Sequence, residues 1–119
     1  MKNKLSALIL FAVIMGVFGL GFVLAEEGTA VHYSKAFQGK PTANKDIFDQ
    51  EGMTAAHKKL PFGTKVKVTN LENNQSVILT INDRIARRNR NVIDVTRRAA
   101  RELGFEKKGH AHVRVEPAQ

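Results

Sequence analysis

The stretch TKVKVTNLENNQSVILTINDR, residues 64–84, carries the clearest fold signal in this chain. Val66 and Val68 alternate with lysines, and after the polar turn LENNQ the alternation resumes with Val77 and Leu79. Alternation of apolar and polar residues is typical of strands that bury one face. Two such strands joined by a short turn predict a β-hairpin, so the fold class is expected to be mainly β.

Three further segments carry the β-branched and aromatic residues, or the alternation, that are typical of strands. They are TAVHYS at 29–34, VIDV at 92–95 and HAHVRVEP at 110–117. A short helix is expected after VIDV, because Thr96 can cap the N-terminus of RRAAREL and Gly104 can end it in a left-handed conformation. Short strands with one helix and no parallel βα repeats predict a small β-barrel, since closure removes exposed sheet edges.

The first 25 residues have the pattern of an export signal. Two lysines precede a long apolar run, and Val23 and Ala25 supply the small residues expected before a signal-peptidase cut. We therefore expect a signal segment at 1–25 and one domain at 26–119. The run is also long enough to span a bilayer, so an uncleaved anchor is the alternative. Either way the domain is expected to be exported, in the periplasm or cell envelope, and to meet the membrane only through an uncleaved N-terminal segment.

The composition of the chain limits the classes of partner that the domain is expected to bind. The chain has no cysteine, so neither disulfides nor the lipid attachment of a lipoprotein is expected. Loss of the signal segment would leave 17 of the 19 lysines and arginines against all 11 acids, a net charge of +6. Seven of the arginines lie between residues 84 and 101. In an exported domain such a run favours anionic envelope polymers over nucleic acid, and a merely solvated basic face is the alternative.

Carboxylates and one imidazole are the groups that could carry chemistry. Asp46 and Asp49 lie in the long polar loop after the first strand, and Asp83 ends the second strand of the hairpin. An acid at a strand end has a rigid backbone and a side chain that reaches the rim, which favours Asp83 as a catalytic acid. Each group has a structural alternative: Asp83 as a turn residue and His57 as a satisfied buried histidine. Asp94, just before the helix, is interpreted as structural.

Other catalytic patterns are missing from the sequence. There is no serine elbow, no glycine-rich phosphate loop and no cysteine nucleophile. His110 and His112 share a strand face without an evident third ligand, so neither a metal nor a cofactor is expected. Carboxylates in an exported cationic domain suit acid-catalysed cleavage of a glycosidic bond, in which a protonated carboxyl in a poorly solvated cleft donates to the departing oxygen.

The order of several segments resembles the RlpA (rare lipoprotein A) family. The resemblance rests on TAVHYSKAFQGKPTANKDIFDQ, on TAAHKKLPFGTKVKVTN, on INDR, on VIDVTRRAARELGF and on GHAHVRVE, and it covers Gly28 to Glu116. It implies a six-stranded double-psi β-barrel with one short helix. We expect the domain to be a monomer. The resemblance also implies a lytic transglycosylase that cleaves the β-1,4 bond from N-acetylmuramic acid to N-acetylglucosamine without water. Such enzymes leave 1,6-anhydromuramoyl ends, with a preference for peptidoglycan glycan strands without stem peptides.

The resemblance also assigns residues to the site. They are, as catalytic, Asp83, His57, Asp49 and Asp46 and, as substrate-binding, Arg84, Thr54 and Asn82. Asp83 matches the principal acid, which would protonate the leaving oxygen and then accept the proton of the muramoyl 6-hydroxyl. His57 is expected to face Asp83 and to orient the substrate or tune the acid.

Two departures from the family pattern keep a second function open. Lys45-Asp46 stands where the family usually has Gly-Glu, and Ile85-Ala86 stands where it usually has Gly-Pro. The first shortens a carboxylate by one methylene, and the second changes the rim beside Asp83. The alternative is therefore a non-catalytic, expansin-like module that binds wall polysaccharide through the same groove.

Overall fold

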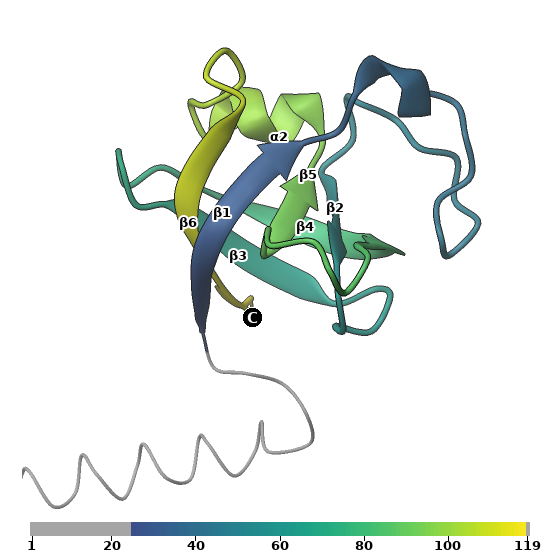
Figure 1. The fold of residues 1–119 in the computed structure, drawn as a ribbon, viewed down its shortest axis with the longest axis horizontal. Helices are drawn as coiled ribbons and strands as arrows, with labels where there is room; N and C mark the ends of the chain where they lie inside the picture. The colour runs from purple at the N-terminus through teal and green to yellow at the C-terminus, as the bar shows by residue number, and fades with distance from the viewer. Residues whose placement is uncertain (1–24, 119) are drawn as a thin grey trace, which may run out of the picture.

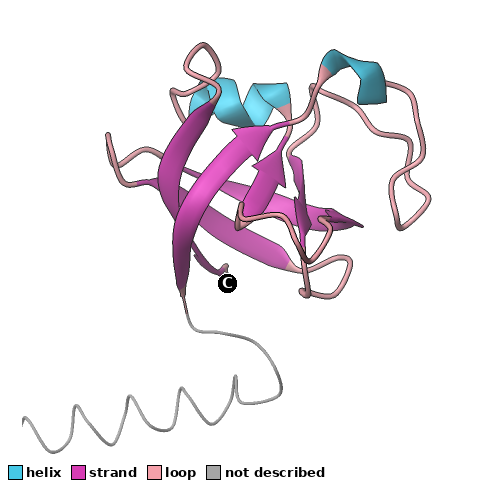
Figure 2. Cartoon of the chain, viewed as in Figure 1, coloured by secondary structure: helices cyan, strands magenta, loops and turns pink. Residues whose placement is uncertain are grey.

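The computed structural model describes residues 25–118, and the strands within that range close into a barrel (Figure 1, Figure 2). Nearly all of the expected signal segment 1–25 lies outside the described residues. In chain order the elements are β1 (Glu26–His32), the 3-10 helix η1 (Lys35–Phe37), β2 (Thr54–His57), β3 (Lys65–Asn70), β4 (Ser76–Arg84), β5 (Ile93–Val95), α2 (Arg97–Glu102) and β6 (His110–Pro117).

Strand order around the barrel is β1, β5, β2, β4, β3 and β6, and β6 pairs again with β1. The expected hairpin is β3–β4, with Val66 opposite Leu79 and Val68 opposite Val77. β1 pairs with β5, and β2 with β4, in parallel, whereas the other pairs are antiparallel. The mainly β fold with six strands and one short helix is therefore confirmed.

The barrel interior is filled by the inward residues of the alternating strands. Val66, Leu79, Ile81 and Val113 are almost fully buried, and Leu103 of the segment after α2 packs against the same core. Burial of this kind contributes roughly 1.5–3 kcal/mol for each large aliphatic side chain. Alternation reveals five of the six strands. It does not reveal β2, whose four residues TAAH include two alanines.

A register shift between β2 and β4 decides which side chains leave the barrel. Ala55 pairs with Ile81, but Ala56 pairs with Asp83, so β4 advances two residues while β2 advances one. Asn82 is the extra residue. Such bulges redirect side chains, and they are frequent beside active sites. Strict alternation from Ile81 would turn Asp83 toward the barrel interior, whereas the shift places it beside Ala56 on the outer face.

The long loop before β2 is folded back on itself. Pro41 forms an isolated bridge with Ile47, and the backbone of Phe48 exchanges hydrogen bonds with Gly39 and Lys40. Phe48 is buried and anchors the loop against the outer face of the barrel. The sequence predicts an irregular segment here. The short pairing within the loop involves too few residues to produce an alternating pattern.

Helix α2 covers one end of the barrel, with the cap that its sequence predicts (Figure 1). The Thr96 hydroxyl accepts a hydrogen bond from the backbone N–H of Ala99, and Gly104 follows the helix with φ +82°. A Cβ at Gly104 would also lie 2.7 Å from Asn73 Nδ2, so the Asn73 side chain would have to move. The left-handed backbone is the stronger reason for glycine here. Within residues 25–118, helices are too short and too polar to cross a bilayer.

Candidate active site

Asp83 is held at the end of β4 by donors from three parts of the chain. The Tyr33 hydroxyl donates to Asp83 Oδ2 at 2.6 Å, and the backbone N–H of Ala43 donates to Oδ1 at 2.8 Å. The backbone N–H of Arg84 donates to the same Oδ1 at 2.9 Å. A carboxylate with three donors has a fixed orientation, as a catalytic group requires.

Asp94 lies beside Asp83 on the same face, with Ala56 between them. Ala56 pairs with Asp83 on β4 and with Asp94 on β5, and cross-strand partners point to the same side of a sheet. Two strand spacings separate the two aspartate backbones by about 10 Å. The small Ala56 side chain leaves open the space into which both carboxyl groups can reach. We call Asp83 and Asp94 the acid pair.

The surroundings of Asp94 favour its protonated form. Burial raises the pKa of the Asp94 carboxyl, the Asn91 side chain opposes this effect, and the negative charge of Asp83 raises the pKa further. Asp94 Oδ1 is buried with no hydrogen-bond partner among residues 25–118. Burial also raises the pKa of Tyr33 far above its usual range, and its hydrogen bond to Asp83 adds to this effect. Tyr33 therefore remains a donor at every physiological pH.

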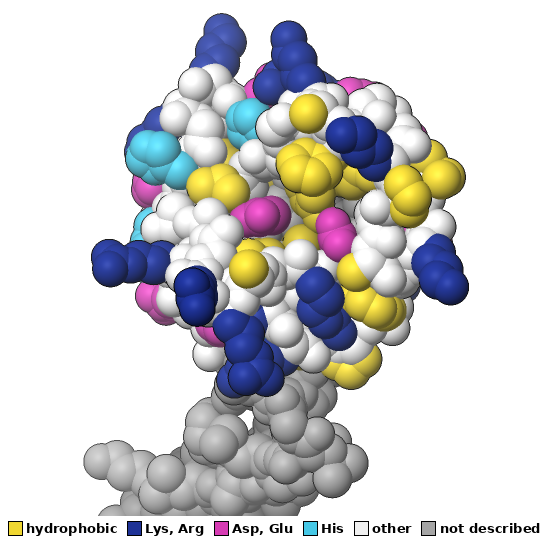
Figure 3. All heavy atoms as spheres, turned by 45° about the vertical axis from the view of Figure 1, so that its right-hand side comes forward, with side chains coloured by type: hydrophobic (Ala, Val, Ile, Leu, Met, Phe, Trp, Pro, Cys, Tyr) yellow, Lys and Arg dark blue, Asp and Glu magenta, His cyan; other side chains and the backbone are white. Residues whose placement is uncertain are grey.

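An apolar floor lies beneath the acid pair. It is formed by the second buried cluster of the domain, which comprises Tyr33, Phe48, Ala56 and Ile85. The Tyr33 ring is stacked at a tilt on Phe48, with centroids 4.2 Å apart, and meets the exposed Phe37 edge-on at 5.6 Å. Figure 3 shows acidic side chains at the centre of this side of the molecule, with hydrophobic groups around them and basic groups farther out.

Asp46 and Asn82 stand beside Asp83. Asp46 Oδ2 accepts hydrogen bonds from the side-chain amides of Asn44, at 3.1 Å, and Asn82, at 3.4 Å. The Asn82 carbonyl also accepts from the N–H of Asn44. These contacts hold the loop whose Ala43 N–H binds Asp83. The structure thus brings Asp46, Asn82 and Asp83 together, with Asn82 largely buried rather than open to a ligand.

Thr54 borders the acid pair, whereas Arg84 pairs with His57 and so points to the other side of the sheet. The exposed Arg84 guanidinium lies 4.1 Å from the centroid of the Phe62 ring, a cation–π contact. Thr54 begins β2, two residues before Ala56 and on the same face, and is partly exposed. Thr54 can therefore meet a ligand that lies along this face, whereas the strand register does not place Arg84 on it.

His57 does not face Asp83, contrary to the sequence-based expectation. It pairs with Arg84, one position beyond Ala56, and so points to the opposite side of the sheet. Its Nδ1 accepts from the backbone N–H groups of Lys59 and Leu60 at 3.0 and 3.1 Å, and its Nε2 donates to Glu26 Oε1 at 2.8 Å. Both ring nitrogens are thus occupied, and the ring is 3% exposed.

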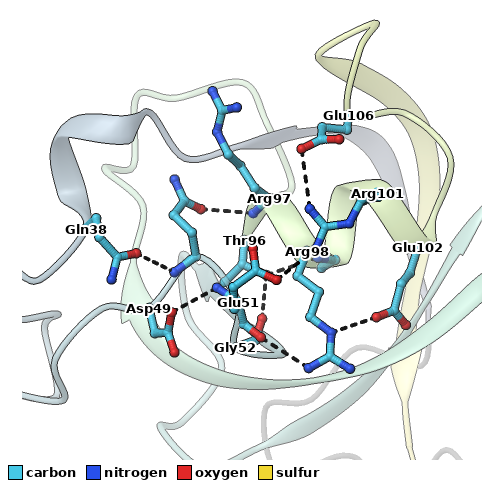
Figure 4. A network of polar contacts seen from close by, with 12 residues as sticks. Gln38, Asp49, Glu51, Gly52, Thr96, Arg97, Arg98, Arg101, Glu102 and Glu106 are labelled. Carbon is cyan, nitrogen blue, oxygen red and sulfur yellow. Dashed lines mark hydrogen bonds and ion pairs between the residues drawn. The ribbon is translucent and has the colours of Figure 1, made fainter.

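Asp49 makes a local turn contact, and no hydrogen bond joins it to the acid pair among residues 25–118. Its Oδ1 accepts from the N–H of Glu51 at 2.9 Å, which makes it a turn residue. Figure 4 shows it at the edge of a polar network in which Glu51 bonds Arg101 and the Gly52 carbonyl accepts from Thr96. This network fastens the loop to α2. The predicted placement of Asp49 around Asp83 stays a prediction.

Tyr33 and Asp94 are the site residues that sequence reasoning missed. The position of Asp94 just before a helix favours a structural interpretation from sequence. The available signal was its position between Ile93 and Val95, two buried residues, which turns Asp94 to the outer face of the barrel. Tyr33 carried no signal, since its contact with Asp83 spans 50 residues of sequence. Within residues 25–118 no group of three acidic or histidine side chains is placed to hold a metal ion.

Comparison with known proteins identifies the family to which this chain belongs. Residues 25–115 match the family described as lytic transglycolase. Proteins named endolytic peptidoglycan transglycosylase RlpA are similar: 48% identical over 89 residues in Pseudomonas aeruginosa and 46% over 95 in Pasteurella multocida. These alignments cover 75% and 80% of this chain but 26% and 32% of the relatives, so the chain spans about a third of their length or less.

Two solved structures share the fold at low sequence identity. An expansin of Clavibacter michiganensis in complex with cellohexaose has a TM-score of 0.62 at 18% identity, over 80% of this chain and 50% of that one. A papain inhibitor of Streptomyces has a TM-score of 0.63 at 16% identity, over 80% and 94%. The barrel is the expected double-psi β-barrel, and the chain belongs to the lytic transglycolase family.

Proposed function

We propose that this domain is an endolytic peptidoglycan lytic transglycosylase. It cleaves the β-1,4 bond from N-acetylmuramic acid to N-acetylglucosamine and leaves 1,6-anhydromuramoyl ends. The observation that carries the proposal is the acid pair, Asp83 and Asp94, on either side of Ala56 above an apolar floor. The names of the relatives, endolytic peptidoglycan transglycosylases, support the choice of reaction.

The reaction needs one proton donor and one proton acceptor. The bond between muramoyl C1 and the bridging oxygen breaks, and that oxygen takes a proton from a carboxyl group. The muramoyl 6-hydroxyl oxygen then bonds to C1, and its proton passes to a carboxylate. Water takes no part, so no room for a hydrolytic water is needed between the acids.

Different surroundings suggest a role for each aspartate. Asp94, whose pKa is raised by burial and by its negative neighbour, is assigned to hold the proton for the leaving oxygen. Asp83, which accepts three hydrogen bonds, is assigned to receive the proton of the 6-hydroxyl. This replaces the sequence-based hypothesis in which Asp83 alone performed both steps. Asp46, one loop away, is assigned to position the substrate with Thr54.

The proposed location of the domain follows from its proposed substrate. Peptidoglycan lies in the cell envelope, so the domain is proposed to act there as an exported monomer on glycan strands without stem peptides. No cofactor is assigned to it.

A wall-binding module without cleavage is the second candidate. The fold it shares with an expansin favours this function, as does Asp46, whose carboxylate is bound by Asn44 and Asn82. One experiment separates the two. The domain is incubated with purified peptide-free glycan, and both pelleting with the polymer and anhydro ends by mass spectrometry are measured. Binding with anhydro products supports the enzyme, whereas binding without products supports the module. No binding at all would overturn both.

A further inference from the structure

A basic segment connects the two strands of the acid pair. Residues 85–92, IARRNRNV, follow Asp83-Arg84 on β4 and lead into β5, where Asp94 lies. We call this segment the arginine loop. Both of its ends are therefore fixed to strands that carry the proposed chemistry, and whatever it binds lies near the acid pair.

The backbone of the arginine loop is ordered by its own hydrogen bonds. Ile85 is buried in the apolar floor, and its N–H donates to the His57 carbonyl at 3.3 Å. The N–H of Asn89 closes a turn onto the Ala86 carbonyl at 3.0 Å, and the N–H of Val92 binds the Thr29 carbonyl at 2.9 Å. Arg87 and Arg88 occupy the centre of that turn. The loop thus presents its charges on a rigid support.

The three arginines of the loop lack acidic partners. Arg87, Arg88 and Arg90 are exposed, and none has a carboxylate oxygen within 4.0 Å among residues 25–118. Arg98 and Arg101 of α2 differ, since they pair with glutamates. The loop itself contains no acid. It therefore presents unneutralised positive charge beside a site whose own side chains are negative.

We propose that the arginine loop binds the lactyl carboxylate of N-acetylmuramic acid in peptide-free glycan. The inference rests on the proposed function and deepens it. The sugar rings of peptide-free glycan and their other substituents are uncharged. The lactyl carboxylate, one on every second sugar, is therefore the anionic group of the strand. Arginine suits it because the planar guanidinium binds a carboxylate through two parallel hydrogen bonds.

Such binding would select strands without stem peptides. An attached stem peptide converts the lactyl carboxylate into an amide, which removes the charge and adds bulk at the same position. The loop then loses its ion pair and meets a steric obstacle. A strand stripped of its peptides offers a regular row of carboxylates, so the arginine loop would hold it in register with the acid pair.

The test compares two glycans and three proteins. The glycans are peptide-free strands and the same strands with the lactyl carboxyl groups reduced to alcohols. The proteins are the domain, the variant R87Q/R88Q/R90Q and the control K40Q/K67Q/K107Q, which removes three exposed charges elsewhere. The wild type and the control should bind the reduced glycan about tenfold more weakly than the unreduced glycan. The loop variant should bind both glycans equally, at the weaker level.

Outcomes for this inference and for the proposed function are distinguishable. Equal binding of the two glycans by the wild type, or discrimination retained by the loop variant, would overturn the inference even if anhydro products form. If the wild type discriminates between the two glycans but forms no anhydro product, the result would support the inference about the arginine loop and contradict the proposed enzymatic function. Tighter binding of poly(glycerol phosphate) than of peptide-free glycan would also overturn the inference about the arginine loop, since the loop would then be a general polyanion site.

Discussion

Tyr33 and Asp83 are joined by a 2.6 Å hydrogen bond although 50 residues separate them in sequence. Barrel closure produces this contact, since Tyr33 directly follows β1 and Asp83 lies near the end of β4. Tyr33 is buried against Phe48, so its hydroxyl has a fixed direction. The bond therefore links the packing of the apolar floor to the orientation of the proposed catalytic carboxylate.

Replacement of Tyr33 by phenylalanine should impair the reaction more than the fold. The ring and its packing stay, but Asp83 Oδ2 loses its donor. Hydrogen bonds to charged groups contribute about 1.5–3 kcal/mol, so kcat should fall roughly tenfold or more, with KM little changed. Kinetics on peptide-free glycan would measure this. An unchanged kcat would show that the orientation of Asp83 by Tyr33 does not matter.

Asp94→Asn should stabilise the domain at neutral pH. Burial raises the pKa of Asp94 above its ordinary value of 3.8, so the folded state favours the protonated form. Stability from this group is fully present below pH 3.8 and is lost as the pH rises through the folded-state pKa. The advantage of the variant in free energy of unfolding should therefore grow from pH 3 to pH 7. Urea titrations at both pH values check this, and an advantage that shrinks with pH would contradict the assigned environment.

His57 should prove a structural residue. Its loss in His57→Ala leaves the N–H groups of Lys59 and Leu60 without an acceptor, which costs about 1–3 kcal/mol for each buried group. His57→Asn, whose side-chain oxygen can replace Nδ1 as acceptor, should recover part of that stability and most of the activity. Urea unfolding beside product formation measures both quantities. Full stability with lost activity in His57→Asn would instead point to a direct chemical role.

Lys45 occupies a left-handed conformation that suits glycine. Its φ is +75°, and left-handed backbone costs a residue with a side chain about 1–2 kcal/mol. Lys45→Gly should therefore raise the melting temperature by several degrees, as about 1 kcal/mol does for a domain of this size. Gly39→Ala is the opposing control, because Gly39 has φ +82° and should lose stability. Equal melting temperatures for wild type and Lys45→Gly would refute the strain.

The sequence was informative wherever structure depends on local pattern. The β3–β4 hairpin, the cap at Thr96 and the glycine after α2 follow from alternation, capping chemistry and the left-handed conformation. The position of Asp83 at a strand end was also predictable. Its direction was not, because the register shift at Asn82 depends on how β2 pairs with β4 across the barrel.

The sequence pattern did not predict which distant residues the barrel brings together. Asp94 joins Asp83 only because β5 and β4 flank the same short strand, β2, and a sequence does not state which strands are neighbours. His57 was misplaced for a related reason. It follows Ala56 directly, so the register that turns Ala56 toward the acid pair turns His57 away from it.

The most direct test of the acid pair is product formation by matched aspartate variants. Wild type, Asp83→Asn, Asp94→Asn and the control Asp49→Asn, a turn residue, are incubated with peptide-free glycan, and anhydromuramoyl ends are counted by mass spectrometry. Loss of a proton-transfer group lowers rates by about 10²–10⁴. We expect losses of at least about a hundredfold for both Asp83→Asn and Asp94→Asn, with Asp49→Asn near wild type. Wild-type rates in Asp94→Asn, or products formed equally by all four proteins, would contradict it.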